Sequence, residues 1–169
     1  MNTDCTVVDI GQHTVYPIFK VGSSSLFAAA DNEYVNQQIE KCKNIVVLIR
    51  EPGDRFCSGL NEYCMRNNLD VEKTWQLVKD EKVIDRHFAP QYLWLVNLYR
   101  FYKGHVTLKY FDHINTITDI HVNKKKDNSK IVEVEPLEKF IQVDRDLMRW
   151  CNYTVQLGDL IKEHRYVLS

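Results

Sequence analysis

The sequence has no excess of charge of either sign. Its 169 residues contain 22 Lys and Arg against 23 Asp and Glu, which gives a formal net charge of −1. A chain that binds nucleic acid or an anionic membrane through its overall field carries a clear positive excess. We therefore expect no nucleic acid and no membrane as a partner, and an anion site here must be a local one.

Cysteines are few and scattered, and long hydrophobic runs are lacking. The five cysteines form no CxxC pair and no Cys/His cluster with zinc-ligand spacing. They are typical of free thiols in a reducing compartment, and no metal is expected. No apolar run approaches the roughly 20 residues that span a bilayer, and MNTDCTVVDIG lacks the basic and apolar regions of a signal peptide. These absences predict a soluble, cytoplasmic protein.

The length and the alternation of elements predict one α/β domain covering residues 1–169. The apolar, β-branched run Asn44–Ile49 is typical of a strand buried on both faces of a parallel sheet. Strands alternating with helices predict an α/β fold with a largely parallel sheet. The predicted strands are 15–19, 44–49 and 106–111; the predicted helices are 25–40, 55–66, 71–80 and 91–102, followed by a mainly helical segment from 135 to 162.

The stretch VYPIFKVGSSSLFAAA, residues 15–30, joins a predicted strand to a predicted helix through a polar loop. Such a turn presents backbone N–H groups and the positive end of a helix to a ligand. Lys20 adds a full charge, Gly22 allows close approach of the backbone, and three serines supply hydroxyl groups. The order is not that of a Walker A motif, GxxxxGK[ST]. The pattern therefore indicates a phosphate cradle, although any strand–loop–helix unit has a similar appearance.

The stretch IVVLIREPGDRFCSGLNEY, residues 45–63, contains a second candidate anion site. Arg50 follows the buried strand at its carboxyl end, where open α/β sheets bind ligands. Its guanidinium suits bidentate phosphate binding, with Ser58 as a hydroxyl donor from the next helix. The alternative is a surface arginine paired with Glu51 or Asp54.

Together, and in this order, the two stretches resemble the nucleotide-binding signature of sulfotransferases that use 3′-phosphoadenosine-5′-phosphosulfate (PAPS). The similarity is to the Golgi carbohydrate sulfotransferases, with their forms PKVGSSS and RDPxxRFxSGxxxY. Here the matching residues are KVGSSS, 20–25, and REPGDRFCSGLNEY, 50–63. Weaker similarities are DRHFAPQ at 85–91 to an HWxPQ segment, KYFDHI at 109–114 to the strand that follows it, and HVNK at 121–124 to an HxNK loop.

The resemblance implies a three-layer, P-loop-like fold with a central, mostly parallel sheet flanked by helices. It also implies PAPS as co-substrate and no metal. It implies that Lys20 binds the bridging oxygen of the phosphosulfate, while the loop holds the 5′-phosphate and Arg50 with Ser58 the 3′-phosphate. The implied cofactor-binding residues are Lys20, Val21, Gly22, Ser23, Ser24, Ser25, Arg50, Ser58, Asn123 and Lys124. One departure is the interval of only 29 residues between Lys20 and Arg50, where the carbohydrate enzymes have a longer insert with acceptor contacts and often the catalytic base.

A hydroxyl acceptor, such as a glycan or another small hydroxylated molecule, requires a general base within hydrogen-bond reach. His87 is the first candidate, because histidine titrates near neutrality, and Glu33 is the second. Structural roles remain alternatives for both, as a histidine hydrogen-bonded near Pro90 and as an exposed helix carboxylate. Two other functions stay open: a non-catalytic nucleotide-binding or interaction domain derived from this fold, and a small P-loop-like kinase.

Overall fold

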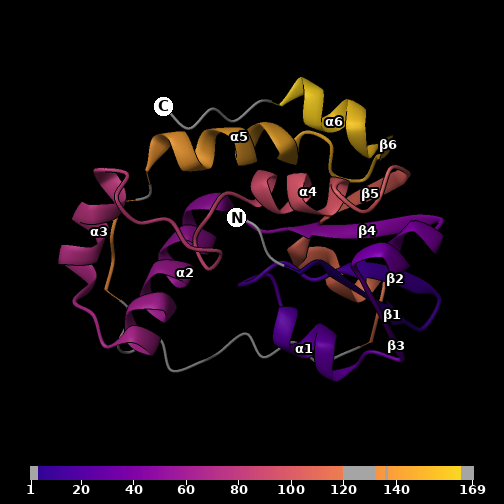
Figure 1. The fold of residues 1–169 in the computed structure, drawn as a ribbon, viewed down its shortest axis with the longest axis horizontal. Helices are drawn as coiled ribbons and strands as arrows, with labels where there is room; N and C mark the ends of the chain where they lie inside the picture. Colours follow the sequence, from indigo (N-terminus) through magenta and orange to yellow (C-terminus); the bar gives the residue numbers. More distant parts are fainter. Residues whose placement is uncertain (1–3, 120–131, 136, 165–169) are drawn as a thin grey trace.

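The computed structural model describes residues 4–119, 132–135 and 137–164, and its described strands form one sheet (Figure 1). The sheet order is β3-β1-β2-β4-β5-β6. The strands are β1 Thr6–Ile10, β2 His13–Tyr16, β3 Asn32–Val35, β4 Asn44–Ile49, β5 His105–Tyr110 and β6 Thr154–Gln156. The helices are α1 Ser23–Ala28, η1 Asn36–Lys41, α2 Pro52–Asn67, α3 Val71–Lys79, α4 Gln91–Tyr99, η2 Phe111–Thr116, α5 Glu138–Met148 and α6 Leu157–Glu163.

The sheet is mixed, with a parallel centre and antiparallel edges. Strand β4 pairs in parallel with β2 and with β5, whereas β1–β2, β1–β3 and β5–β6 are antiparallel. The α/β class is confirmed, but the expectation of a mostly parallel sheet was wrong. One of the three antiparallel pairs arises at Gly11, whose φ of 59° allows the tight turn that folds β2 back onto β1 as a hairpin.

The predicted helix over residues 25–40 was also wrong, because α1 ends at Ala28 and the chain then forms β3 and η1. Edge pairing with β1 replaces the helix. The backbone N–H of Asp31 donates to the carbonyl of Asp9 at 2.8 Å, and the Tyr34 hydroxyl donates to the Asp9 carboxylate at 2.6 Å. Glu33 consequently lies on an exposed edge strand opposite Val8.

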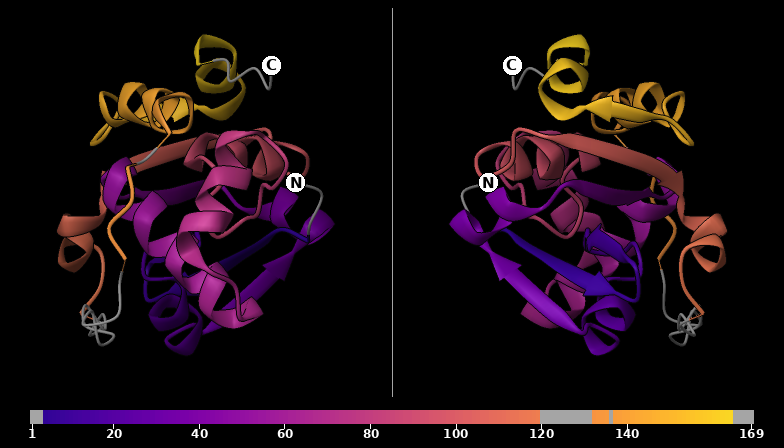
Figure 2. Two further views of the ribbon diagram at one scale, coloured as in Figure 1. Left: turned by 90° about the vertical axis from the view of Figure 1, so that its left-hand side faces the viewer. Right: turned by 90° about the vertical axis from the view of Figure 1, so that its right-hand side faces the viewer.

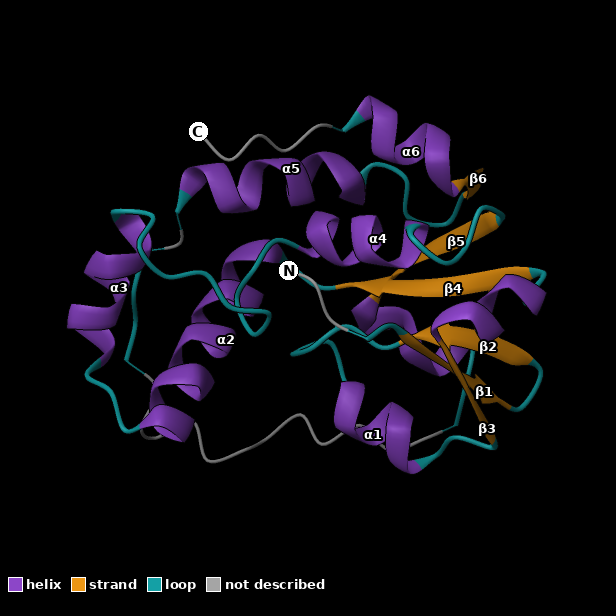
Figure 3. Cartoon of the chain, in the orientation of Figure 1, coloured by secondary structure: helices purple, strands orange, loops and turns teal. Residues whose placement is uncertain are grey.

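The helices lie on different sides of the strands (Figures 1 and 2). In Figure 1, α5 and α6 lie at the top, α4 lies between them and β4, and α1 lies at the bottom. Helices α2 and α3 extend beyond the carboxyl end of β4 (Figure 3). The main core covers the sheet and buries five of the six residues of β4. A second apolar cluster, Phe56, Leu60, Cys64, Val78, Phe88 and Phe140, holds α2 against α3 and α5. Within the described ranges, no helix combines the length and the apolar character needed to cross a membrane.

Helix α2 touches the backbone of the segment before α4 at Gly59. A Cβ atom at this position would lie 1.9 Å from the carbonyl oxygen of His87 and 3.1 Å from the Cα atom of Phe88. Both atoms belong to the main chain and cannot move aside by a change of rotamer. The glycine in the SG pair of the second motif is therefore required by this helix-to-backbone contact.

Replacing Gly59 by alanine should lower the free energy of unfolding by about 1–3 kcal/mol, because the added methyl group overpacks a backbone contact. Urea unfolding of wild type and Gly59→Ala measures the loss. Met65→Ala is the control on the same helix, since the Met65 side chain is exposed, and it should change stability by less than about 0.5 kcal/mol. A Gly59→Ala protein as stable as the wild type would contradict the close packing.

Candidate functional site

The carboxyl ends of β2 and β4 meet at one edge of the sheet, and a cleft of about 930 Å³ opens there. Parallel neighbouring strands bring the loops that follow them to the same edge. The cleft is lined by parts of both sequence motifs, by α2 and by the segment before α4. Its lining includes Lys20, Gly22, Ser23, Ser24, Ser25, Arg50, Ser58 and His87.

The loop between β2 and α1 turns sharply at two residues with positive φ. Lys20 has φ 66° and Gly22 has φ 72°, in the left-handed region that favours glycine. Between them, Val21 is 1% exposed and belongs to the core, so its side chain does not reach the cleft. Gly22 is the N-cap of α1 without a side-chain cap. The first-turn N–H groups of a helix have no intrahelical partner, so they add donors beside the serine hydroxyls.

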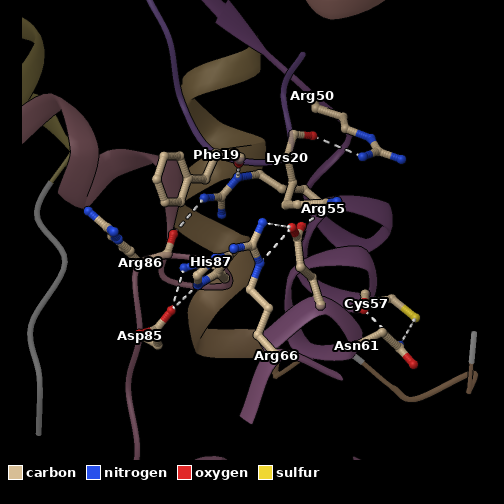
Figure 4. A network of polar contacts seen from close by, with 11 residues as sticks. Phe19, Lys20, Arg50, Arg55, Cys57, Asn61, Arg66, Asp85, Arg86 and His87 are labelled. Atoms are coloured by element: carbon tan, nitrogen blue, oxygen red, sulfur yellow. Dashed lines mark hydrogen bonds and ion pairs between the residues drawn. The ribbon is translucent and has the colours of Figure 1, made fainter. Parts of the chain in front are cut away.

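Arg50 connects the two motifs directly. Its Nη1 donates to the carbonyl oxygen of Lys20 at 2.9 Å (Figure 4), which uses one of the five N–H donors of the guanidinium. The Gln91 amide holds the Arg50 main chain on both sides: its Oε1 accepts from the Arg50 N–H at 2.9 Å, and its Nε2 donates to the Arg50 carbonyl at 3.0 Å. Arg50 is thus fixed where the strand ends, beside the loop of the first motif.

Arg55 is a site residue whose role the sequence did not reveal. Its guanidinium is 2% exposed and donates to three backbone carbonyls, of Phe19 at 3.0 Å, Ala89 at 2.5 Å and Arg86 at 3.4 Å. Burial lowers the pKa of Arg55 to about 10, while the charge of Asp144 acts in the opposite direction. Arg55 lies between the Phe19 and Arg86 segments (Figure 4) and ties the first motif to the segment that carries His87.

Asp144, on α5, is buried at the start of α4. Its carboxylate accepts from the backbone N–H of Gln91 at 2.8 Å and of Tyr92 at 2.9 Å, two donors that the helix itself leaves without partners. Burial raises the pKa of Asp144 to about 6, against the lowering effect of Arg55 and of these hydrogen bonds. Asp144 thereby fixes Gln91, which in turn fixes Arg50.

One face of α2 runs along the cleft. Asp54, Ser58, Glu62 and Arg66 follow one another at intervals of four residues, so they lie in a row on the helix, and all four line the cleft. Glu62 pairs with Lys20 at 2.6 Å and with Arg66 at 2.9 Å. The resemblance pointed to Ser58, but the carboxylate that pairs with the loop lysine was not predicted; the four-residue spacing from Ser58 is the signal that points to it.

His87 lines the cleft with a fixed ring. Its Nδ1 lies 2.5 Å from Oδ1 of Asp85, and the same oxygen accepts from the His87 backbone N–H at 2.9 Å. The ring also packs against Phe19, with 5.2 Å between the ring centroids. A histidine whose Nδ1 is held by a carboxylate has Nε2 available for proton transfer.

Phe19, the residue before Lys20, anchors the loop by packing. Its ring lies 5.0 Å from that of Trp94, and the Arg86 guanidinium lies 4.6 Å above it. The Trp94 indole N–H donates to the Arg86 carbonyl at 3.2 Å. These contacts place an arginine beside the cleft opposite α2, since Arg86 also lines it.

Not every predicted site residue reaches the cleft. Glu33 lies on edge strand β3 and is not among the lining residues, so it does not meet the requirement for a base beside the loop. Asn123 and Lys124, together with His121, lie outside the described residues. Across the ranges that the structure describes, no group of three or more His, Cys, Asp or Glu side chains is arranged to hold a metal ion.

Comparison with known proteins gives the chain no family. No family model matches it, and neither a curated protein sequence nor a solved structure matches it. The assignment of function therefore depends on the residues and on the geometry of the cleft.

The Asp144→Asn variant should be less stable, with a deficit that depends on pH. The amide loses an acceptor for one of two buried N–H groups, a cost of about 1–3 kcal/mol at low pH. Because burial raises the pKa of Asp144 from 3.8 to about 6, the native state keeps a proton that the unfolded chain releases in this range. The contribution of Asp144 to the free energy of unfolding of the wild type therefore falls as the pH rises through 6. The difference in stability between the wild type and Asp144→Asn becomes smaller over the same range.

Urea unfolding of both proteins at about pH 4.5, 5.5 and 7 covers this range. Asp146→Asn, on the exposed side of the same helix, is the control and should differ from wild type by less than about 0.5 kcal/mol. A deficit that grows as the pH rises would show that the native protein stabilises the ionised carboxylate.

Proposed function

We propose that this chain is a sulfotransferase that moves a sulfuryl group from PAPS to a hydroxyl acceptor, a glycan or another small hydroxylated molecule. One observation carries the proposal: the Arg50 guanidinium bonds the Lys20 carbonyl at 2.9 Å, so both anion-binding motifs face one cleft. A nucleotide phosphorylated at both ends requires two anion sites in one cleft, and parts of both motifs line this one. The parallel pairing of β2, β4 and β5 supports the proposal, because it brings the loops after β2 and β4 to the same edge of the sheet.

The residues present fit the two ends of this nucleotide. Lys20, the serine hydroxyls and the first-turn N–H groups form the cradle for the 5′-phosphosulfate, and Arg50 with Ser58 forms the second site for the 3′-phosphate. PAPS supplies the activated sulfuryl group when it is bound. The protein positions the partners and neutralises the charge that develops on the leaving phosphate oxygen, the role of the Lys20 ammonium.

His87 is the proposed base for the acceptor hydroxyl. It lines the same cleft as Lys20, and Asp85 holds its Nδ1, which leaves Nε2 to take the proton. Its contact with Phe19, the residue before Lys20, keeps the ring next to the loop. Of the two base candidates in the sequence, His87 alone is a lining residue of the cleft.

Arg50→Ala and Lys20→Ala should each weaken the binding of 3′,5′-ADP by at least about tenfold, because each removes a charge-assisted contact with a phosphate group. Isothermal titration calorimetry of the two variants and the wild type measures the change. Arg149→Ala removes an equal charge from an exposed position at the C-cap of α5. This variant should bind 3′,5′-ADP with the affinity of the wild type.

The same titrations separate the proposal from its alternatives. A preference for ATP with Mg²⁺ over 3′,5′-ADP would contradict it and favour a kinase. Tight binding of 3′,5′-ADP without transfer in a screen of radiolabelled PAPS against glycans, steroids, phenols and peptides would favour a non-catalytic nucleotide-binding domain.

His87→Ala should lower the turnover number by about a hundredfold or more, the usual effect of removing a general base, with the affinity for 3′,5′-ADP little changed. Turnover is measured with the acceptor found in the screen, and affinity by calorimetry. His113→Ala is the control, a histidine on η2 that is not among the lining residues. Full activity in His87→Ala would exclude this histidine as the base.

A further inference from the structure

The lysine of the first motif already has an anionic partner inside the cleft. The Lys20 ammonium lies 2.6 Å from Oε2 of Glu62, and the two side chains are only 17% and 10% exposed. The other carboxylate oxygen of Glu62 accepts from Arg66 at 2.9 Å. A nucleotide that uses Lys20 therefore competes with Glu62 for the charge of this ammonium group.

We infer that Glu62 competes with the nucleotide for Lys20. It forms an ion pair with Lys20 when the cleft is empty, and it lowers the affinity for the product nucleotide after transfer. The inference rests on the proposed function, because the competing anion is the phosphosulfate of PAPS or the phosphate of 3′,5′-ADP. It assigns a role to a residue of α2 that neither sequence motif singled out.

The geometry favours an exchange of partners over a permanent ion pair. An ammonium group has three donors, so Lys20 can turn toward a phosphate oxygen without passing through an unpaired state. Glu62 keeps its contact with Arg66 when Lys20 leaves, so the carboxylate does not become an uncompensated charge in a partly buried place. Both halves of the exchange therefore have a charged partner available.

The other acids along the cleft do not have this relation to Lys20. Glu51 accepts from the backbone N–H groups of Gly53 and Asp54 and serves as the N-cap of α2. Asp54 begins the row of α2 residues two helical turns before Glu62. Among the described residues that line the cleft, Glu62 is the acid in ion-pair contact with Lys20.

This arrangement affects the release of product more than the chemical step. A carboxylate paired with Lys20 opposes bound phosphate by competing with it for the Lys20 ammonium. Because affinity changes at one site act mostly through the dissociation rate, removing the competitor should slow release. Glu62 is thus a positioning residue that acts through Lys20.

Glu62→Gln should bind 3′,5′-ADP about tenfold more tightly than the wild type, since a partly buried ion pair no longer has to be broken. Calorimetry at fixed ionic strength gives the affinity, and stopped-flow displacement gives the dissociation rate, which should fall by a similar factor. Asp54→Asn is the matched control, because it removes the same charge from the same helix face and should tighten binding by less than about threefold.

A double-mutant cycle separates competition from a structural role. In a Lys20→Met background, Glu62→Gln should change the affinity by less than about twofold, because the competed partner is gone. Glu62→Asp keeps the charge but moves the carboxylate away from Lys20, so this variant should bind 3′,5′-ADP with intermediate affinity. It replaces Glu62→Gln in the test if Glu62→Gln does not fold.

Three results decide the matter. A wild-type protein that does not bind 3′,5′-ADP overturns the proposed function, and this inference with it. A wild type that binds, with Glu62→Gln no tighter than Asp54→Asn, overturns the role of Glu62 alone. Equal tightening by Glu62→Gln with and without Lys20 shows a general charge effect and also overturns it.

Discussion

The buried guanidinium of Arg55 is the interaction on which the candidate site depends. From α2 it donates to the carbonyls of Phe19, Arg86 and Ala89. It thereby fixes the residue before Lys20 and both sides of His87 with one planar group. A buried arginine is costly unless its donors and its charge are matched. Here three carbonyls accept from three of the five N–H donors, and Asp144 contributes the opposing charge.

The same network extends to Arg50 through Gln91. Asp144 holds the start of α4, Gln91 at that start holds both main-chain groups of Arg50, and Arg50 holds the carbonyl of Lys20. Each link is a hydrogen bond within or beside a buried region, so the loop and the strand end cannot move independently. The cleft is therefore organised before a ligand enters it, which lowers the cost of ordering side chains on binding.

The sequence predicted the elements that have a clear hydrophobic pattern of their own. It missed those that form only through pairing with another strand. Strand β4 was predicted at its observed bounds, because the five consecutive apolar residues 45–49 suit a doubly buried strand. Strand β3 was taken for helix, since its four residues have little pattern of their own and form a strand only through β1. For the site, Lys20, Arg50, Ser58 and His87 lie together, whereas Glu62 and Arg55 required three-dimensional contacts.

The interval between Lys20 and Arg50 constrains where an acceptor can be bound. Its 29 residues are taken up by α1, β3, η1 and β4, and α1 contributes Ser23, Ser24, Ser25 and Phe27 to the lining of the cleft. If the chain transfers a sulfuryl group, the interval is too short to supply all the acceptor contacts, and other lining segments must contribute. The face of α2 that carries Glu62 and Arg66 and the segment of Arg86 and His87 are two of these segments. Acceptor selection would then lie on elements that Arg55 and Gly59 already hold in place.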